Sequence, residues 1–319
     1  MPSPLISVVI PTLHPQRWLP ACLQSLSVQS ISPLDFEIVV VDNSGGQAAP
    51  IADSARSGNI RVLANAVNQG VTATFNQGIQ ATRTPFVALL NDDTTVSPRW
   101  LQALIEAMQP HDVGSCASLM VFDEQPHKVQ SAGIAIDRAA IAWDRLGGHP
   151  VSEAQQSCEV FGASGGAALY RREMLDQIGL FDARYFAYLE DVDLAWRAQR
   201  AHWRCMFVPA ALVRHKTSAT SGANSPFKNR LLGRNKIWLA AKNARYRDFP
   251  VVILYDLLAV LWAGASRKDW SHLQGRWDAL AGLGQRLRER QGQTATSTAH
   301  FDPLIAPWRV PARMGIRSA

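Results

Sequence analysis

The stretch Phe86-Val87-Ala88-Leu89-Leu90-Asn91-Asp92-Asp93 places an acidic turn directly after a short apolar run. An apolar run of this length predicts a strand that is buried on both faces of a parallel sheet. The carboxyl ends of such strands are where open α/β sheets bind ligands. We therefore expect Asp92 and Asp93 to lie in a binding site, where carboxylate oxygens suit a divalent cation such as Mg²⁺ or Mn²⁺. The alternative is an Asn/Asp turn that leads into a helix near Pro98.

Strand-like and helix-like segments alternate through the first 121 residues. This alternation predicts an α/β fold with a mainly parallel, open sheet flanked by helices. The expected strands are 5–11, 36–42, 60–64, 85–90 and 113–121, and the expected helices are 16–29, 71–81 and 98–108. The rhythm changes after residue 122. There we expect a hairpin and loop excursion over 123–160, strands over 167–170, 204–208 and 211–215, a helix over 189–201 and a mobile loop over 217–226.

A second acidic cluster, Glu190-Asp191-Val192-Asp193, opens the helix expected over 189–201. Helical geometry places Glu190 and Asp193 on one face and turns Asp191 about 100° away. Acidic residues in a first turn also complement the helix dipole, but three acids in four residues exceed that need. The cluster follows the aromatic stretch 185–188. Because an apolar wall raises the basicity of a carboxylate, the cluster is a candidate general base.

Other polar residues follow predicted strands in the same way. Asp42 and Asn43 should lie beside Pro11 and Thr12, where they could contact a base edge or simply form an Asx turn. The segment Asn68-Gln69-Gly70 precedes a helix whose N-terminus suits anions, and Gly70 permits close approach of the backbone. His215 follows a short predicted strand. It is a candidate metal or phosphate contact, with a structural role as the alternative.

Charge is distributed unevenly. Residues 1–227 carry 16 Lys or Arg and 20 Asp or Glu, a net −4, whereas residues 228–290 carry 13 and 5, a net +8. Within the basic part, 249–263 is the most apolar stretch of the chain, with basic residues and tryptophans on both sides. It is too short to predict a membrane span. Basic flanks with aromatics are typical of a helix in the membrane interface. A nucleic-acid patch or a helix packed on the main domain are the alternatives.

Several classes of protein fit less well. The four cysteines are scattered and lack metal-ligand spacing, so we expect reduced thiols in a reducing compartment. The N-terminus has no basic region, so we expect no secretory signal. No G-x-G-x-x-G follows the first strand, which disfavours a dinucleotide oxidoreductase. The segment 12–16 also lacks the glycine-rich, basic phosphate loop of a nucleotidyltransferase. A non-catalytic sugar-binding or membrane-binding scaffold would not require both acidic clusters.

Several short motifs, taken in their order and spacing over about residues 5–245, resemble those of a known family. The motifs are Val8–Thr12, Val41–Ser44, Asn68–Gly70, Asn91–Asp93, Gly179–Asp182 and Glu190–Arg197. Together they resemble the family 2 glycosyltransferases of GT-A fold, and most closely the bacterial rhamnosyltransferase-like members that build surface polysaccharides. The resemblance implies a GT-A type nucleotide-diphospho-sugar transferase fold with a C-terminal helical extension. It also implies inverting transfer of a sugar, with rhamnose as the candidate, from a nucleoside-diphosphate sugar.

The resemblance also implies roles for residues. Asp42 would contact the nucleotide base, Asp93 would bind the metal together with His215, and Asp191 would deprotonate the acceptor hydroxyl. The motif here is N-D-D rather than D-x-D, which leaves open whether Asp92 touches the ribose or supports the metal ligand. The remaining implied substrate contacts are Pro11, Thr12, Asn43, Asn68, Gly70, Gly165, Gly166, Glu190 and Arg234.

We expect three regions. Residues 1–227 would form the catalytic domain, with a donor half over 1–121 and an acceptor half over 122–227. Residues 228–290 would form the basic helical extension, and 291–319 a poorly packed tail. The expected partners are a nucleoside-diphosphate sugar, a glycan or polyprenyl-linked acceptor and an anionic membrane surface, without nucleic acid. The expected location is cytoplasmic, peripheral at the inner face of the cell membrane.

Overall fold

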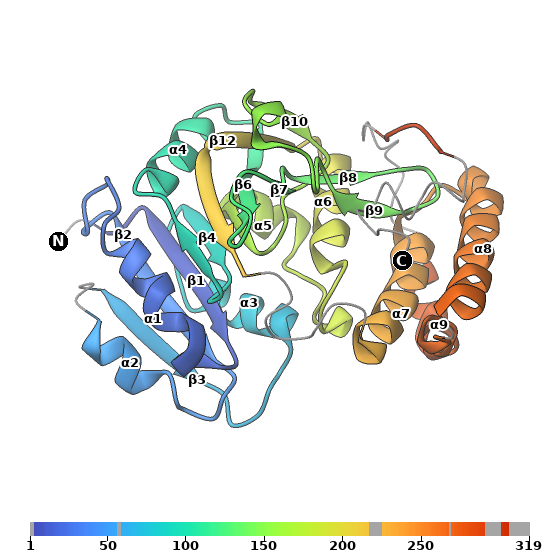
Figure 1. Cartoon of the computed structure of the whole chain (residues 1–319), viewed down its shortest axis with the longest axis horizontal. Coiled ribbons are helices and arrows are strands. Elements are labelled where there is room, and N and C mark those ends of the chain that lie inside the picture. The colour runs from blue at the N-terminus through green and yellow to red at the C-terminus, as the bar shows by residue number, and fades with distance from the viewer. Residues whose placement is uncertain (1–2, 56–58, 217–224, 268, 291–300, 306–319) are drawn as a thin grey trace.

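The computed structural model describes residues 3–55, 59–216, 225–267, 269–290 and 301–305 (Figure 1). Its centre is a ten-stranded sheet with the strand order β10-β12-β6-β11-β4-β1-β2-β3, in which β5 pairs with β12 and β7 pairs with β6. A separate two-stranded sheet joins β8 to β9. The strands are β1 Ile6–Thr12, β2 Phe36–Asp42, β3 Ile60–Ala64, β4 Phe86–Leu90, β5 Thr94–Val96, β6 Val113–Phe122, β7 Val129–Ser131, β8 Ile134–Ile136, β9 Ala142–Asp144, β10 Cys158–Val160, β11 Ala167–Arg171 and β12 Arg204–His215.

The strands β1 to β4 form a parallel half of the sheet. β1 is buried along its whole length, and β4 along all but its first residue, as apolar runs covered on both faces must be. β11 runs antiparallel to β4 and β6, between which it lies. β6 in turn pairs in parallel with β12. The predicted open, mainly parallel α/β sheet is therefore confirmed, with β11 as an antiparallel insertion.

Helices cover both faces of the sheet (Figure 1). On one face, the α1 residue Leu19 and the α4 residue Trp100 pack into the core. On the other face, Phe75 of α3 and Leu194 of α6 do so. The helices are α1 Pro15–Leu26, α2 Ala49–Ser54, α3 Val71–Gln80, α4 Trp100–Ala107, α5 Arg172–Ile178, α6 Glu190–Arg200, α7 Pro226–Asn243, α8 Phe249–Arg267, α9 Ser271–Leu280 and α10 Leu283–Arg290. Short 3₁₀ turns occur at Val151–Glu153, Ala183–Tyr185 and Tyr246–Asp248.

Two sequence-based boundaries were wrong. The strands expected over 204–208 and 211–215 form one strand, β12, whose register against β6 shifts between Val208 and Leu212. An irregularity of this kind adds residues to one strand without ending its pairing. Pro226 does not belong to a loop but begins α7, where the Ser225 hydroxyl accepts a hydrogen bond from the amide of Lys228 at 3.3 Å. Residues 217–224 of the expected loop lie outside the described residues.

The C-terminal helices form a group beside the sheet (Figure 1). α7 packs between α6 and α9, and α8 is the outermost helix of the group in this view. The tight crossing of α7 and α9 uses Gly275, since a Cβ there would lie 2.0 Å from the carbonyl oxygen of Arg230. Within the described ranges, no helix has the length and apolar character needed to cross a membrane.

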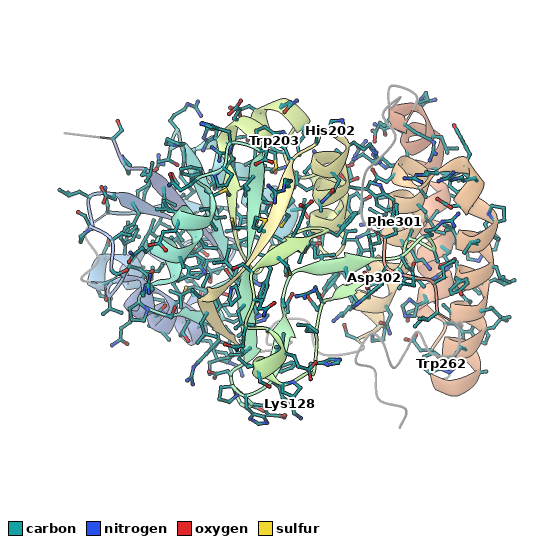
Figure 2. The ribbon with its side chains drawn as sticks, turned by 90° about the horizontal axis from the view of Figure 1, so that it is seen from above. Lys128, His202, Trp203, Trp262, Phe301 and Asp302 are labelled. Carbon is teal, nitrogen blue, oxygen red and sulfur yellow. The ribbon has the colours of Figure 1, made fainter. Side chains whose placement is uncertain are left out.

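A short piece of the predicted tail packs against the rest of the protein. The Asp302 amide donates a hydrogen bond to the carbonyl of Ile136 at 2.9 Å. The Phe301 ring lies 5.7 Å from the ring of Trp196 on α6. Figure 2 shows Phe301 and Asp302 beside the C-terminal helices. The ranges 291–300 and 306–319, which make up the rest of the predicted tail, lie outside the described residues.

A buried ionic cluster joins α6 to α7. Asp193 is fully buried, and its Oδ2 lies 2.9 Å from both the Arg197 guanidinium and the Lys242 ammonium. Its Oδ1 accepts a hydrogen bond from Asn243 at 2.8 Å. Burial alone would raise the pKa of Asp193, but Arg197 and Lys242 lower it below its usual range. Both oxygens of this carboxylate thus accept from donors of α6 or α7.

We predict that Asp193→Ala lowers the free energy of unfolding by about 3–5 kcal/mol, because it leaves the buried Lys242 without its carboxylate. Glu106→Ala, which removes an exposed ion pair with Arg99 at 3.7 Å, is the control and should change stability little. Urea denaturation followed by circular dichroism measures both. Equal midpoints for the two variants would contradict the role of the cluster.

Candidate active site

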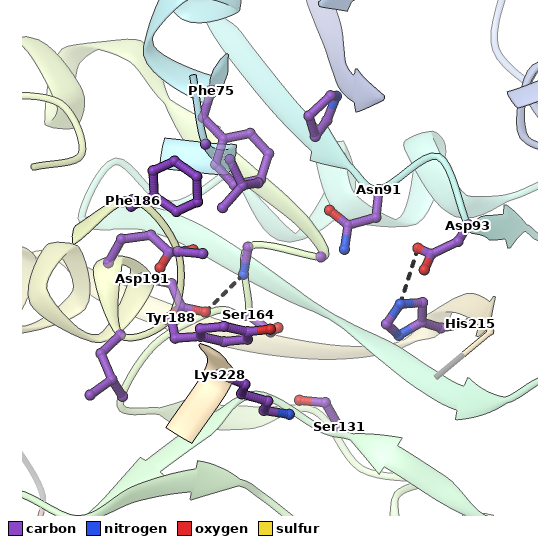
Figure 3. A pocket seen from close by; sticks show the side chains of 18 of the residues that line it. Phe75, Asn91, Asp93, Ser131, Ser164, Phe186, Tyr188, Asp191, His215 and Lys228 are labelled. Atoms are coloured by element: carbon purple, nitrogen blue, oxygen red, sulfur yellow. Dashed lines mark hydrogen bonds and ion pairs between the residues drawn. The ribbon is translucent and has the colours of Figure 1, made fainter. Parts of the chain in front are cut away.

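A pocket of about 670 Å³ opens at the carboxyl ends of β1 and β4. Its walls come from segments far apart in sequence: the ends of these strands, the glycine turn at 164–166, the first turn of α6, the β8–β9 hairpin and the start of α7. Figure 3 shows Asp93 and Asp191 on opposite sides of this pocket. The pocket therefore presents two separate acidic groups to anything bound between them.

The first acidic group follows β4, as the sequence predicts. The Thr12 hydroxyl at the end of β1 donates a hydrogen bond to Oδ2 of Asp92. Burial, with a further contribution from the charge of Asp93, raises the pKa of Asp92 to about 7 despite the Thr12 hydrogen bond. The side chain next to it, Asp93, has its Oδ1 3.1 Å from Nε2 of His215.

His215 reaches Asp93 because β12 pairs antiparallel with β5, which sets His215 opposite Thr94. The other ring nitrogen, Nδ1, lies 2.9 Å from Oε1 of Gln130, so the ring is held from both sides. The fold thus brings together Asp93 and His215, which the sequence suggested separately as metal contacts.

These residues fit a divalent cation. Oδ1 of Asp93 is buried and makes no hydrogen bond, although it lies at ion-pair distance from His215. Among the described residues that line the pocket, five are acidic, and only His215 and Lys228 are basic. A bound diphosphate would therefore meet repulsion unless a cation accompanied it. No cluster of three or more His, Cys, Asp or Glu suited to a metal occurs in the part of the chain that the structure describes. The site suits a cation that takes one or two protein ligands and completes its shell with phosphate and water.

The second acidic group opens α6. Oδ2 of Asp191 accepts a hydrogen bond from the Gly165 amide at 3.1 Å, and its Oδ1 accepts one from the Val192 amide at 2.8 Å. Burial nevertheless raises the pKa of Asp191 above its usual range. Burial, and then the adjacent charge of Asp191, raises the pKa of Glu190. Oε2 of Glu190 is buried without a hydrogen-bond partner among the described residues. Both carboxyls can therefore accept a proton near neutral pH.

The loop before α6 has an unusual backbone. Phe186, Tyr188 and Leu189 have φ values of 66°, 70° and 67°, in the left-handed region that residues other than glycine seldom adopt. Buried Asn235 of α7 directs its Nδ2 at the carbonyls of Tyr185, Ala187 and Tyr188 at 3.1, 2.8 and 2.7 Å. This amide thus holds the loop in the shape that presents Glu190 and Asp191 to the pocket.

Gly70 brings the first half of the protein against the same loop. It has a φ of +80°, and a Cβ at this position would lie 2.5 Å from the Phe186 ring. The Thr72 amide also donates a hydrogen bond to the Phe186 carbonyl at 3.2 Å. Glycine is therefore required at residue 70 both for its backbone and for the close approach of Phe186.

Most of the residues predicted for the site line this pocket. They are Pro11, Thr12, Asn43, Asn68, Gly70, Asp92, Asp93, Gly165, Gly166, Glu190, Asp191 and His215. Asp42 does not line it: its buried carboxylate accepts hydrogen bonds from the Ser44 and Ala48 amides at 2.7 and 2.8 Å. Arg234 is also outside the lining and donates to the Tyr185 carbonyl at 2.8 Å. Asp42 and Arg234 therefore shape loops beside the pocket.

Sequence reasoning missed one wall of the pocket. Gln130, Ser131, Trp143 and Asp144 come from the 123–160 excursion, which was predicted only as a hairpin and loop. Tyr188, Phe227 and Lys228 were also missed, and the Lys228 ammonium lies 5.3 Å from the centre of the Tyr188 ring. The available signal was the position of the excursion, since long connections at the ligand-binding edge of a sheet commonly carry function.

Comparison with known proteins agrees with this geometry. The family model described as Glycosyl transferase family 2 matches residues 7–179, more than half of the chain, so the protein belongs to this family of glycosyltransferases. An N-acetylglucosaminyl-diphospho-decaprenol L-rhamnosyltransferase of Mycobacterium tuberculosis is 27% identical over 246 residues, which cover 68% of this chain and 78% of the relative. The uncharacterized protein y4gI of Sinorhizobium fredii is 26% identical over 86% of this chain, but the match spans only 31% of that longer protein.

Solved structures confirm the GT-A glycosyltransferase fold. A mannosyltransferase from Pyrobaculum calidifontis, in complex with GDP-Man and Mn²⁺, has a TM-score of 0.55 at 14% identity and covers 93% of this chain and 77% of its own. The S. aureus protein TarS 1-349 has a TM-score of 0.57 at 17% identity, over 89% of this chain and 81% of its own. At these identities the likeness establishes the fold alone.

We predict that Asn235→Ala loosens the loop before α6. Hydrogen exchange of the amides of residues 186–191 should accelerate at least about tenfold, and the free energy of unfolding should fall by about 1–3 kcal/mol, because the carbonyls of Ala187 and Tyr188 lose the Asn235 donor. The Tyr185 carbonyl loses Asn235 but retains Arg234. Asn229→Ala is the matched control, since this buried asparagine of α7 bonds Asp269 at 2.6 Å instead. If both variants exchange at the wild-type rate over 186–191, Asn235 does not hold the loop.

Proposed function

We propose that this protein is a metal-dependent, inverting glycosyltransferase. It transfers a sugar from a nucleoside-diphosphate sugar to a hydroxyl of a glycan or lipid-linked acceptor in bacterial surface polysaccharide synthesis. The observation that carries the proposal is the placement of two acidic groups, Asp92–Asp93 and Glu190–Asp191, on opposite sides of one pocket. One side suits a leaving diphosphate with its cation, and the other suits a base acting on the acceptor.

On the donor side, Asp93 with His215 would hold Mg²⁺ or Mn²⁺, and Asp92 would support them through Thr12. When bound, the cation stabilises negative charge on the departing nucleoside diphosphate. Two solved structures of similar fold, the Pyrobaculum mannosyltransferase and GalNAc-T7, contain Mn²⁺, which supports a divalent metal here. The ends of β1 and β2, with Pro11, Asn43 and Asn68 in the lining, would receive the nucleoside. Asp42 would act there indirectly, by fixing the loop from Ser44 to Ala48.

On the acceptor side, Asp191 would act as the general base. A single displacement forms the bond between the acceptor oxygen and the anomeric carbon as the bond from that carbon to the diphosphate breaks. The hydroxyl proton passes to the Asp191 carboxylate. One base and one leaving group suffice for inversion, whereas retention through a covalent intermediate needs a carboxylate nucleophile. Gly165 and Gly166 would admit the acceptor, because they keep the turn beside Asp191 free of side chains.

The mycobacterial relative supports a lipid-linked acceptor and rhamnose as the sugar. We extend both to this chain as part of the proposal, with the protein acting on the cytoplasmic side and held peripherally at the inner face of the membrane. Residues 1–227 would provide the catalytic domain and 228–290 a basic extension that supports it.

We predict that Asp93→Ala abolishes metal-dependent binding of a nucleoside diphosphate while leaving the fold intact. The buried Oδ1 of this carboxylate makes no hydrogen bond and has only the ion-pair contact with His215, so the fold depends little on it. Calorimetry with uridine, guanosine and thymidine diphosphates, each with and without Mn²⁺, measures the effect. Asp112→Ala, which removes a carboxylate paired with Arg204 at 3.1 Å, is the control. Unchanged Mn²⁺-dependent affinity in Asp93→Ala would refute the assignment.

We predict that Asp191→Asn lowers kcat by roughly 10²–10⁴-fold with little change in donor affinity, as expected for loss of a general base. Because the pKa of Asp191 is raised, the working ionised form is lost as pH falls through a value above the usual aspartate range. The acid limb of kcat/KM should therefore lie above about pH 4. Glu190→Gln is the comparison: if it loses turnover and Asp191→Asn retains it, Glu190 is the base.

A further inference from the structure

Helix α8 exposes its apolar side. Ile253 is 66% exposed, Leu257 is 56% exposed and Leu261 is 52% exposed. With 3.6 residues per turn, these side chains fall on one half of the helix together with their exposed neighbours. The exposed apolar set on α8 is Ile253, Leu254, Leu257, Leu258, Leu261 and Trp262. We call these six residues the α8 apolar face. In Figure 1, α8 lies at the outer edge of the protein, and Figure 2 shows Trp262 at the end of this edge.

The inward side of the same helix carries a charge. Asp256 is buried against the other helices, where it lies 3.2 Å from the Lys236 ammonium of α7 and 2.6 Å from the Arg276 guanidinium of α9. Val252 and Val260 are the buried apolar residues beside it. A surface helix of a globular protein ordinarily turns its apolar side inward and its charges outward. α8 instead carries apolar residues on both sides and turns its one carboxylate, Asp256, inward, so its outward face exposes apolar side chains that a partner could cover.

Either a second copy of this chain or a lipid surface could cover such a face, and charge distinguishes between them. A second copy of this chain would bring the basic segment 228–290 against an identical segment. Its net charge is +8 by sequence, although Lys242 and Arg286 are buried and pair with acids of the catalytic part. Like charges would oppose that pairing. An anionic lipid surface would instead attract the segment, and exposed Arg247 and Arg288 belong to it. Tryptophan also favours the boundary between headgroups and acyl chains. Trp262 belongs to the face, and the ring of half-exposed Trp270 packs against Gly264 of the same helix.

We propose that the α8 apolar face lies flat in the interface of an anionic membrane. The helix runs parallel to the surface, its leucines reach the acyl boundary, and the basic segment meets the headgroups. This surface would hold the pocket near lipid-linked acceptors, and in this respect it rests on the proposed function. Membrane binding itself requires only the α8 face and can be measured without any sugar.

The test is flotation of the full-length chain with vesicles of phosphatidylglycerol and phosphatidylcholine, and with vesicles of phosphatidylcholine alone. We expect wild-type protein to float with the anionic vesicles and to bind less at high salt. Leu257→Glu with Leu261→Glu should lower the partition coefficient at least about tenfold. Leu34→Glu with Val67→Glu is the matched control, because both residues are exposed apolar side chains on the catalytic part. All four positions are exposed, so both variants should keep the wild-type circular dichroism spectrum and unfolding midpoint.

Two outcomes would overturn the proposal. In one, wild-type protein stays unbound to anionic vesicles at low salt. In the other, light scattering shows a wild-type dimer that the α8 variant converts to monomer, which would assign the face to a second copy. Slow hydrolysis of nucleotide sugars, measured on the same samples without lipid, separates the two hypotheses. Hydrolysis with no vesicle binding rejects the membrane face alone. Vesicle binding with no hydrolysis of uridine, guanosine or thymidine diphosphate sugars counts against the proposed function alone.

Discussion

The position of α6 depends on the Asp193 carboxylate, which lies in the core between Arg197 and Lys242. The first turn of this helix carries Glu190 and Asp191, which line the pocket, together with Asp193, which lies in the core. Two uncompensated acids at the pocket wall repel each other, and burial makes their ionised forms costly. The paired carboxylate of Asp193 in the same turn anchors the helix while these two remain unneutralised. Within four residues, the protein thereby separates an acid that stabilises the fold from two acids that face the pocket.

The described lining of the pocket contains more acidic than basic residues. Asp92 and Asp93 at one end and Glu190 and Asp191 at the other are all largely buried, yet few basic groups of the described lining approach them. Under the proposed function, such a pocket would repel a bare diphosphate and would accept one that brings a divalent cation. Burial raises the pKa of Asp191, and the nearby charge of Asp144 adds to this effect. In the proposed function, burial would therefore supply the basicity of Asp191, and the surplus of carboxylate would favour a donor accompanied by a cation.

The sequence predicted the parts of the site that depend on local pattern. The apolar run before Asp92 must be a buried strand, and the acids must then emerge at its carboxyl end, so the first acidic group followed directly. The second followed from the crowding of acids at a helix start.

Asp42 and Arg234 were predicted in the pocket but lie outside it, because their contacts depend on loop geometry and on the packing of α7. The wall from Gln130 to Asp144 was missed for the same reason: a hairpin carries no local mark of what it faces. The predicted end of the strand at residue 208 was wrong for a related reason. A register shift between Val208 and Leu212 lets β12 continue through residues that resemble a turn in sequence.

The amide of Asn235 has a consequence for how this protein can be divided. The matched family region ends at residue 179, before either reactive acid of α6, and the groups that hold those acids in place come from α7. A chain cut after residue 227 would keep every carboxylate of the pocket and lose both Asn235 and Lys242. The chemical groups of the site and their mechanical support are thus encoded in different stretches of the chain. A chimera that exchanges C-terminal helices between relatives must therefore take α6, the loop before it and α7 from the same parent protein.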